Sequence, residues 1–262
     1  MQHVVITGGS SGIGEAFARL HLARGDRVSL IARDAERLVA CKNKLAASGG
    51  TLSTHSADVR DAAALEAAIA AAEAEFGPTT RLITSAGVAV PGYFEALDAD
   101  SFREQMDINF HGTVHAVRAV YDGMTQRRSG EILLVSSAAA FVGLFGYTAY
   151  GASKFAVAGF AESLRAEARR HDIKVAVCFP PDTETPQLEA ESRLKPPETA
   201  RITKSGGIMT ADQLATSVVR DFERGKFAIY PGLRVSLLGR FSSLARPAIN
   251  RWLDRTAERA DR

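Results

Sequence analysis

Seven short apolar runs, most of them separated by helix-length segments, constrain this chain of 262 residues more than any other feature. The runs are His3–Thr7, Arg27–Ala32, Thr51–Ser56, Thr80–Ser85, Gly130–Ser136, Ile173–Phe179 and Lys226–Ile229. Regular alternation of strand and helix is typical of a parallel sheet, because each crossover helix packs on one face of the sheet. The near-continuous apolar run from Glu131 to Val135 indicates a strand buried on both sides. We therefore predict an α/β fold, a doubly wound parallel sheet with helices on both faces.

Composition and length indicate one globular domain. Hydrophobic residues make up 46% and charged residues 24% of the chain, which is ordinary for a globular protein. We expect a single domain over residues 1–232 and a separate tail over 233–262. The segment Pro180–Thr210 departs from the alternation and is rich in proline and charge, so we expect residues 186–210 to form a substrate loop or lid. The net charge of +2 gives no general attraction to nucleic acid.

A glycine-rich loop follows the first predicted strand and opens a helix. Its sequence is Thr-Gly-Gly-Ser-Ser-Gly-Ile-Gly, from Thr7 to Gly14. Glycines let the backbone approach a pyrophosphate closely, and the start of the helix offers free N–H groups. Such a loop can also be a purely structural turn, but its place between the first strand and a helix favours a dinucleotide site. The candidate cofactor-binding residues here are Gly8, Ser10, Ser11, Gly12, Ile13 and Gly14.

The end of the second strand bears on the choice of nicotinamide dinucleotide. Enzymes that prefer NAD usually carry an acidic residue there, about 20 residues after the loop, to bind the ribose 2′-hydroxyl. Here Ala32 takes that position and Arg33 follows, and a guanidinium pairs well with a 2′-phosphate. The alternative is that Arg33 is a solvated residue at a helix start, and the nearby Asp34 counts against phosphate. We predict NADP(H), with Asp58 and Val59 beside the adenine.

Four polar residues form a candidate catalytic group. Tyr150 and Lys154 lie four residues apart, so on a helix they share one face. A nearby ammonium should lower the pKa of the tyrosine, which suits a proton donor to a carbonyl oxygen. Ser137 follows a buried strand, at the edge where α/β sheets bind ligands. Asn109 lies within a helical segment and could hold a water that relays protons to Lys154. Each residue alone also has a structural reading, as a surface helix pair or a helix cap.

The glycine loop, Asn109, Ser137, Tyr150 and Lys154 together resemble the short-chain dehydrogenase/reductase family, in order and spacing, over residues 1–230. The resemblance implies a Rossmann-type sheet of seven parallel strands. It also implies that Tyr150 is the acid/base, that Lys154 holds the nicotinamide ribose and that Ser137 orients the substrate. Asn109 would complete a proton relay.

One departure from the family pattern follows the fourth strand. The family usually has Asn-Asn-Ala-Gly there, whereas this chain has Thr84-Ser85-Ala86-Gly87. Ala86 and Gly87 still permit close approach of the backbone to the cofactor, so we include both as cofactor-binding residues. The change affects the strand-stabilising role of the asparagines and leaves the chemistry intact.

Three segments are similar to the 3-ketodihydrosphingosine reductases within that family. They are Leu144–Tyr150, Phe179–Pro186 and Glu191–Thr199. The resemblance implies NADPH-driven reduction of the 3-keto group of a long-chain 2-amino-1-hydroxy ketone, a step of sphingoid-base synthesis. It adds Pro180, Thr183 and Thr185 to the cofactor-binding residues, the two threonines at positions that contact the nicotinamide amide and the phosphates.

The tail is amphipathic and basic. Leu233, Leu237, Phe241, Leu244 and Trp252 recur at roughly helical spacing, and residues 233–262 carry a net charge of +4. Such a helix can lie on an anionic membrane surface, or its apolar residues can pack on the protein body or on a second subunit. Pro247 should break or kink a single long helix.

The chain begins directly with a strand, so we expect no signal peptide and a cytoplasmic protein, with peripheral contact to the cytoplasmic face of the membrane. We also expect a homo-oligomer, a dimer or tetramer. A metal site is not expected, since His111 and His115 are four residues apart but lack further ligands.

Two other functions remain open from the sequence. The substrate could be another lipophilic ketone or alcohol, of steroid, 3-ketoacyl or retinoid type, because the motifs for the chemistry do not select the substrate. The chain could also bind NADP(H) without catalysis, although the presence of Tyr150 and Lys154 argues against this.

Overall fold

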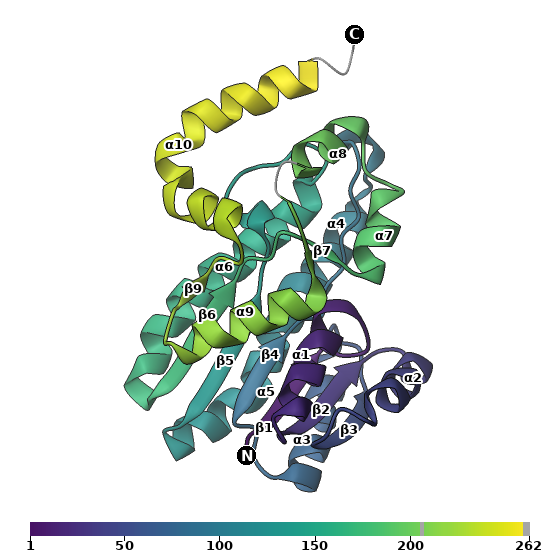
Figure 1. The fold of residues 1–262 in the computed structure, drawn as a ribbon, viewed down its shortest axis with the longest axis vertical. Helices are drawn as coiled ribbons and strands as arrows, with labels where there is room; N and C mark the ends of the chain where they lie inside the picture. Colours follow the sequence, from purple (N-terminus) through teal and green to yellow (C-terminus); the bar gives the residue numbers. More distant parts are fainter. Residues whose placement is uncertain (205–206, 259–262) are drawn as a thin grey trace.

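The computed structural model describes residues 1–204 and 207–258, and its centre is a seven-stranded parallel sheet (Figure 1). The strands run in the order β3-β2-β1-β4-β5-β6-β9. Their bounds are β1 His3–Thr7, β2 Arg27–Ala32, β3 Thr51–Ser56, β4 Arg81–Thr84, β5 Gly130–Val135, β6 Ile173–Cys178 and β9 Ala228–Ile229. The predicted doubly wound sheet is confirmed. Strand β9 is two residues shorter than predicted, because only Val177 and Cys178 of β6 pair with it.

Helices cover both faces of the sheet. On one face lie α1 (Gly12–Ala23), α2 (Ala35–Leu45) and α9 (Ala211–Glu223); on the other lie α3 (Ala62–Phe76), α5 (Gly112–Arg127) and α6 (Thr148–Ala168). Successive strand residues point to opposite faces, so Val4 and Ile6 join the core under α1 whereas Val5 joins the core under α3. Both cores are apolar, which explains why the central strands read as unbroken hydrophobic runs.

Short helical turns complete the alternating part of the chain. Helix α4 (Ala99–Met106) continues through the π-helical turn η2 (Asp107–His111) directly into α5. Three 3-10 turns occupy connections: η1 (Phe94–Ala96), η3 (Ala138–Ala140) and η4 (Arg169–His171). The π turn is the irregularity that carries Asn109, and π turns within helices are often found at functional sites.

The segment predicted to be a loop has a structure of its own. It contains β7 (Asp182–Glu184), α7 (Pro186–Ser192), α8 (Pro197–Lys204) and β8 (Ile208–Thr210). The two short strands pair with each other in parallel, outside the main sheet. Thr185 is the N-cap of helix α7, and its Oγ1 accepts a hydrogen bond from the Leu188 N–H at 3.2 Å. Strands of three residues are too short to show an alternating pattern, so the sequence did not predict them.

The tail forms one helix, α10 (Leu233–Glu258), with Pro247 inside it. Figure 1 shows that the helix bends along its length, so the expected kink is observed rather than a break. Helix α10 packs beside α8 and η3, with Val235 and Leu253 buried. No helix in the described part of the chain is both long and apolar enough to cross a membrane.

Close packing of the first helix against the loop before it can be tested at Gly14. A Cβ there would lie 2.3 Å from the Gly8 carbonyl oxygen, a backbone atom that cannot swing aside. We expect Gly14→Ala to lower the free energy of unfolding by about 1–3 kcal/mol, measured by urea titration with circular dichroism. The control is Gly159→Ala in α6, where no described atom lies within 4 Å and the change should be neutral or stabilising. Equal unfolding midpoints for the two variants would contradict this packing.

Candidate active site

A cavity of about 550 Å³ opens at the carboxyl ends of β1, β4, β5 and β6. In the sheet, β1 lies between β2 and β4. The chain runs outward from β1 through β2 to β3 on one side, then crosses back to β4 and runs outward through β5 and β6 on the other side. This switch point is where doubly wound sheets bind ligands. The walls come from the glycine loop, the ends of the central strands, α6, the β7–α8 segment and α10. The cavity therefore joins the predicted cofactor residues to the predicted catalytic residues.

The glycine loop forms the floor at one end of the cavity. Gly8, Ser10, Ser11, Gly12 and Ile13 line it, whereas Gly14 packs beneath, against Gly8. Gly8 has φ +68°, and a Cβ on it would lie 2.5 Å from the Ala86 backbone nitrogen. In the described structure Ser11 begins α1 without a capping hydrogen bond from its side chain. The N–H groups of the first turn thus keep their donor capacity, which suits a pyrophosphate.

The far end of this floor carries Arg33, Asp58 and Val59. The Arg33 side chain is 68% exposed, and its Nη1 lies 3.9 Å from Asp58 Oδ2. Hydrogen bonds from Arg60 hold the pKa of Asp58 below its usual value. Asp34, which argued against a phosphate, caps α2 by accepting a hydrogen bond from the Arg37 N–H at 3.0 Å. Its carboxylate is therefore committed to the helix, while Arg33 faces the cavity.

Three of the four predicted catalytic residues line the same cavity. Ser137 follows β5, while Tyr150 and Lys154 lie one turn apart on α6. The Lys154 Nζ is 5.8 Å from the centre of the Tyr150 ring and donates a hydrogen bond to the Val135 carbonyl oxygen at 3.2 Å. Ser137 hydrogen-bonds Tyr150. A hydroxyl, a phenol and an amine thus converge at the strand ends.

The electrostatics of this group differ from the sequence-based expectation. Burial raises the pKa of Tyr150, and its hydrogen bond with Ser137 offsets only part of that effect. Burial also lowers the pKa of Lys154 to about 8. The prediction that Lys154 lowers the tyrosine pKa was wrong for this structure, because burial disfavours the phenolate and dominates the pKa of Tyr150. Tyr150 is a protonated phenol at neutral pH, which is the form that can donate a proton.

Asn109 lies under the cavity instead of on its wall. Its Oδ1 accepts from the Val88 N–H at 2.8 Å, and its Nδ2 donates to the Val88 carbonyl at 2.9 Å and to Ser153 Oγ at 2.8 Å. A Cβ on Gly87 would lie 3.1 Å from Asn109 Oδ1 and 3.4 Å from Lys154 Nζ. The structure therefore places Asn109 beside Lys154 and occupies its side chain with fastening hydrogen bonds. Its part in a proton relay stays a prediction.

The remaining predicted cofactor residues line the cavity between these two ends. They are Ala86, Gly87, Pro180, Thr183 and Thr185. Thr84, which stands where the family usually has asparagine, is buried, and its Oγ1 has no hydrogen-bond partner among the described residues. The end of β4 is thus held by backbone pairing, including a hydrogen bond from Ser85 N–H to the Thr7 carbonyl at 3.0 Å.

Sequence reasoning missed two sets of cavity residues. The first is polar: Tyr147, Asp182 and Glu191. The position of Tyr147, three residues before Tyr150 and immediately before α6, was the one signal that could have identified it. The second set comes from the tail: Arg234, Val235, Leu238, Ile249, Trp252 and Leu253. Nothing in a local pattern says that a terminal helix folds back over a distant strand edge.

The described residues contain no group of three side chains with metal-ligating chemistry. His111 and His115 turn to separate partners, since His111 Nδ1 contacts Asp107 Oδ1 at 2.9 Å and His115 Nδ1 contacts the Val59 carbonyl at 2.9 Å.

Comparisons with known proteins agree with this architecture. The family model of the short chain dehydrogenases matches residues 2–195. The 3-dehydrosphinganine reductase of Danio rerio is 40% identical over 230 residues, covering 86% of this chain and 69% of the zebrafish protein. A 3-dehydrosphinganine reductase of Arabidopsis thaliana is 36% identical over 256 residues, covering 96% of this chain and 77% of that protein. A short-chain dehydrogenase from Sphingobium yanoikuyae, solved in complex with NADPH, has a TM-score of 0.80 at 28% identity, covering 95% of both chains.

The chain belongs to the short-chain dehydrogenase family, and it is an oxidoreductase that acts on a carbonyl or hydroxyl group. The relatives that it resembles over most of its length are both named 3-dehydrosphinganine reductase.

Proposed function

We propose that this protein reduces the 3-keto group of 3-ketodihydrosphingosine to dihydrosphingosine with NADPH. The observation that carries the proposal is one cavity that joins the Ser137–Tyr150–Lys154 group to a long apolar wall from α10. The similarity to 3-dehydrosphinganine reductases over most of the chain supports the choice of substrate.

The residues fit NADPH along the floor of the cavity. Gly8 packs against the Ala86 backbone too closely for a side chain, which fixes the shape of the loop, and the first turn of α1 supplies N–H donors for a pyrophosphate. Arg33 supplies a guanidinium for the 2′-phosphate, with Asp58 and Val59 beside the adenine. When bound, NADPH supplies the hydride for the ketone carbon. Lys154, next to Gly87, is placed to hold the nicotinamide ribose.

The polar group at the other end handles the proton. Tyr150 carries its proton on a phenol whose pKa burial raises, so it donates to the carbonyl oxygen as that oxygen gains charge. Ser137 orients the same oxygen by a hydrogen bond. Lys154, with a pKa near 8, can exist in both protonation states near neutral pH and so can return a proton to Tyr150.

The apolar wall suits a long alkyl chain. Val142 from the β5–α6 connection and Val235, Leu238, Ile249 and Leu253 from α10 line the cavity beyond the catalytic group. Contact of methylene groups with such a wall contributes about 0.8 kcal/mol for each CH₂ removed from water. The tail therefore serves as part of the substrate site.

The activity can be measured directly. Purified protein should oxidise NADPH in mixed micelles of 3-ketodihydrosphingosine, with dihydrosphingosine identified by mass. We expect Tyr150→Phe to lower kcat by at least about 10²-fold, because general acid catalysis contributes that much, while the NADPH fluorescence titration stays unchanged. Turnover by Tyr150→Phe near the wild-type rate would disprove the acid role. No turnover by wild-type protein that binds NADPH would redirect the search to steroid, 3-ketoacyl or retinoid-type substrates, or to a binding protein without catalysis.

Cofactor preference provides a second test. Arg33→Ala should reduce the ratio of kcat/KM for NADPH over NADH by about 10-fold or more, because a charge-assisted contact to the 2′-phosphate is lost. Arg37→Ala is the matched control, since Arg37 is 73% exposed and its guanidinium contacts Asp34 instead of the cavity. If the two variants keep the same NADPH:NADH ratio as wild type, Arg33 does not bind the phosphate.

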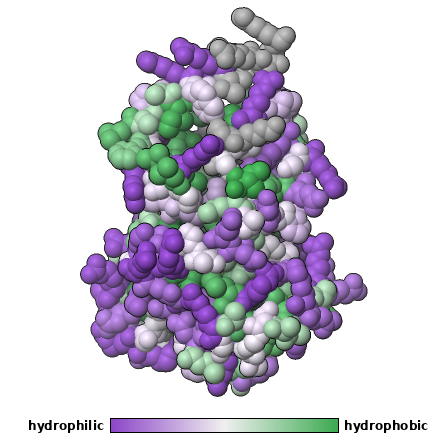
Figure 2. Space-filling model, viewed as in Figure 1, coloured by the Kyte–Doolittle hydropathy of each residue, from purple (hydrophilic) through white to green (hydrophobic). Residues whose placement is uncertain are grey.

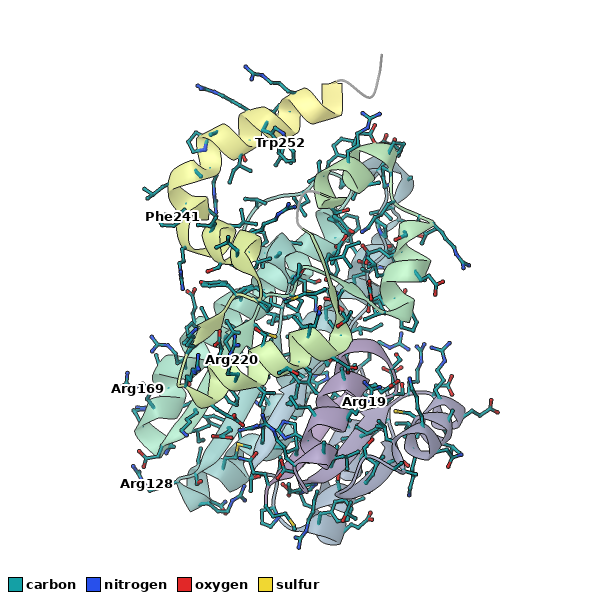
Figure 3. All side chains as sticks on the ribbon, viewed as in Figure 1. Arg19, Arg128, Arg169, Arg220, Phe241 and Trp252 are labelled. Carbon is teal, nitrogen blue, oxygen red and sulfur yellow. The ribbon has the colours of Figure 1, made fainter. Side chains whose placement is uncertain are left out.

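We further propose that α10 meets an anionic membrane surface, which would make a cytoplasmic protein peripheral to the membrane that holds its substrate. Leu233, Leu237, Phe241 and Leu244 are all more than half exposed at helical spacing. Figure 2 shows hydrophobic surface over the first part of α10, and Figure 3 shows Phe241 on its outer flank. The net charge of +4 over residues 233–262 supports an anionic partner.

Oligomers are common in this family, and we propose a homo-oligomer here too.

Vesicle co-sedimentation separates membrane contact from subunit contact. We expect binding to phosphatidylcholine vesicles that contain phosphatidylglycerol, and about 10-fold weaker binding for Phe241→Ser, because a buried phenyl group contributes roughly 1.5–3 kcal/mol. Val39→Ser is the control, an exposed apolar residue on α2. Loss of a dimer in light scattering by Phe241→Ser, with vesicle binding absent in wild type, would instead assign this flank to a subunit interface.

A further inference from the structure

A cluster of charged side chains lines the substrate end of the cavity and has no part in the mechanism above. Asp182 lies on β7 and Glu191 on α7, and both face the cavity. Lys195 lies just after α7 and contacts Glu191 Oε1 at 3.0 Å and Asp182 Oδ2 at 3.3 Å. Tyr147 donates a hydrogen bond from its hydroxyl to Glu191 Oε1. These contacts hold both carboxylates against the cavity wall.

The charges of this cluster do not balance. One lysine faces two carboxylates, so the group carries a net charge of −1. Burial, followed by the Glu191 charge, raises the pKa of Tyr147, so the phenol stays neutral. The Glu191 and Lys195 side chains are only 9% and 4% exposed. An unbalanced charge in such surroundings is costly to desolvate, and a cation that enters the cavity relieves that cost.

The cluster adjoins the reacting group. The rings of Tyr147, which immediately precedes α6, and Tyr150, in its first turn, are 5.3 Å apart, centre to centre. The charges of Glu191 and Asp182 reach Tyr150, where they add to the effect of burial in raising its pKa. The two carboxylates therefore line the same cavity as Tyr150 and act on it electrostatically.

We propose that Glu191 and Asp182, whose charge Lys195 neutralises only in part, bind an ammonium group on the carbon next to the reacting carbonyl. They would make the enzyme selective for α-amino ketones over ketones that lack the amine. The proposal rests on the proposed function, because 3-ketodihydrosphingosine carries its amine on carbon 2, next to the 3-keto group. Lys195 contacts Glu191 through Oε1 and Asp182 through Oδ2, so neither contact uses the second oxygen of either carboxylate.

The alternative is purely structural: the ion pairs only fasten the β7–α8 segment. The two readings predict different results when a negative charge is removed and when the positive charge is removed. Removal of a carboxylate charge should weaken amine recognition, whereas removal of the lysine charge should leave it intact or strengthen it. A fastening role predicts the same effect from both changes.

The experiment compares two ketones at a pH where the substrate amine is protonated. One is 3-ketodihydrosphingosine and the other is 1-hydroxyoctadecan-3-one, which has the same chain without the amine. The readout is the ratio of kcat/KM for the two within each variant, so that the fraction of folded enzyme cancels. Wild-type protein should favour the amine by about 10-fold or more, because a charge-assisted contact is worth roughly 1.5–3 kcal/mol.

The variants then assign the selectivity. Glu191→Gln, which retains an acceptor for Tyr147, should lower the ratio about 10-fold through a higher KM for the amine, and Asp182→Asn should act in the same direction. Lys195→Met should not lower it. The control is Glu198→Gln, since Glu198 is also buried and accepts a hydrogen bond from the Tyr93 hydroxyl at 3.3 Å but lies outside the cavity wall.

The outcomes are distinct. If wild type reduces both ketones equally well, or if Glu191→Gln and Lys195→Met lower the ratio together, amine recognition by this cluster is wrong while the reductase assignment stands. If wild type reduces neither ketone, the proposed function itself has failed.

Discussion

The side chain of Asn109 joins three segments on whose relative position the active site depends. It clamps the Val88 backbone on both its N–H and its carbonyl and donates to Ser153 on α6. This fixes the segment after β4, which carries Gly87, directly below Lys154. The π-helical turn at residues 107–111, between α4 and α5, directs Asn109 inward. The Asn109 side chain is completely buried there. A buried amide that makes three hydrogen bonds specifies one arrangement, because any slip would leave polar groups unpaired in the interior.

Burial around this clamp sets the proton chemistry. Tyr150 and Lys154 are packed so closely that the neutral form of each is favoured, which raises the pKa of one and lowers that of the other. The sequence predicted the pairing but not this balance. Spacing along a helix shows which side chains share a face, whereas desolvation depends on residues from other elements. The Lys154 amine contacts the Val135 carbonyl, a partner 19 residues away that no local pattern identifies.

The same distinction explains how much of the fold could be read in advance. Six of the seven sheet strands were located to within one residue at each end, and five of them are mostly buried segments between turn residues, whereas β3 is mostly polar and partly exposed. Strand β9 was too long in the prediction, since its pairing is limited by β6 and not by its own sequence. The β7–β8 pair was missed because three residues show no periodicity. Arg33, Ser137, Tyr150 and Lys154 were found, whereas Tyr147, Asp182 and Glu191 were not, because their significance lies in contacts between separate elements, such as Tyr147 with Glu191, 44 residues away.

The tail connects these observations to the substrate. One flank of α10 closes the cavity with Leu238, Ile249 and Leu253, and Trp252 lies on the side that faces α8 (Figure 3). Another flank presents Leu237, Phe241 and Leu244 outward. A helix that is apolar on two sides is poorly suited to water alone, because both stripes need a partner. If a membrane covers the outer stripe, as we propose, the mouth of the cavity lies next to the bilayer. A lipid would then enter head-first along α10, so that its polar head reaches the carboxylates at the inner end while its chain stays against α10. The bend near Pro247 changes the direction of α10. One helix can therefore line the cavity with one flank and present its other flank to the membrane.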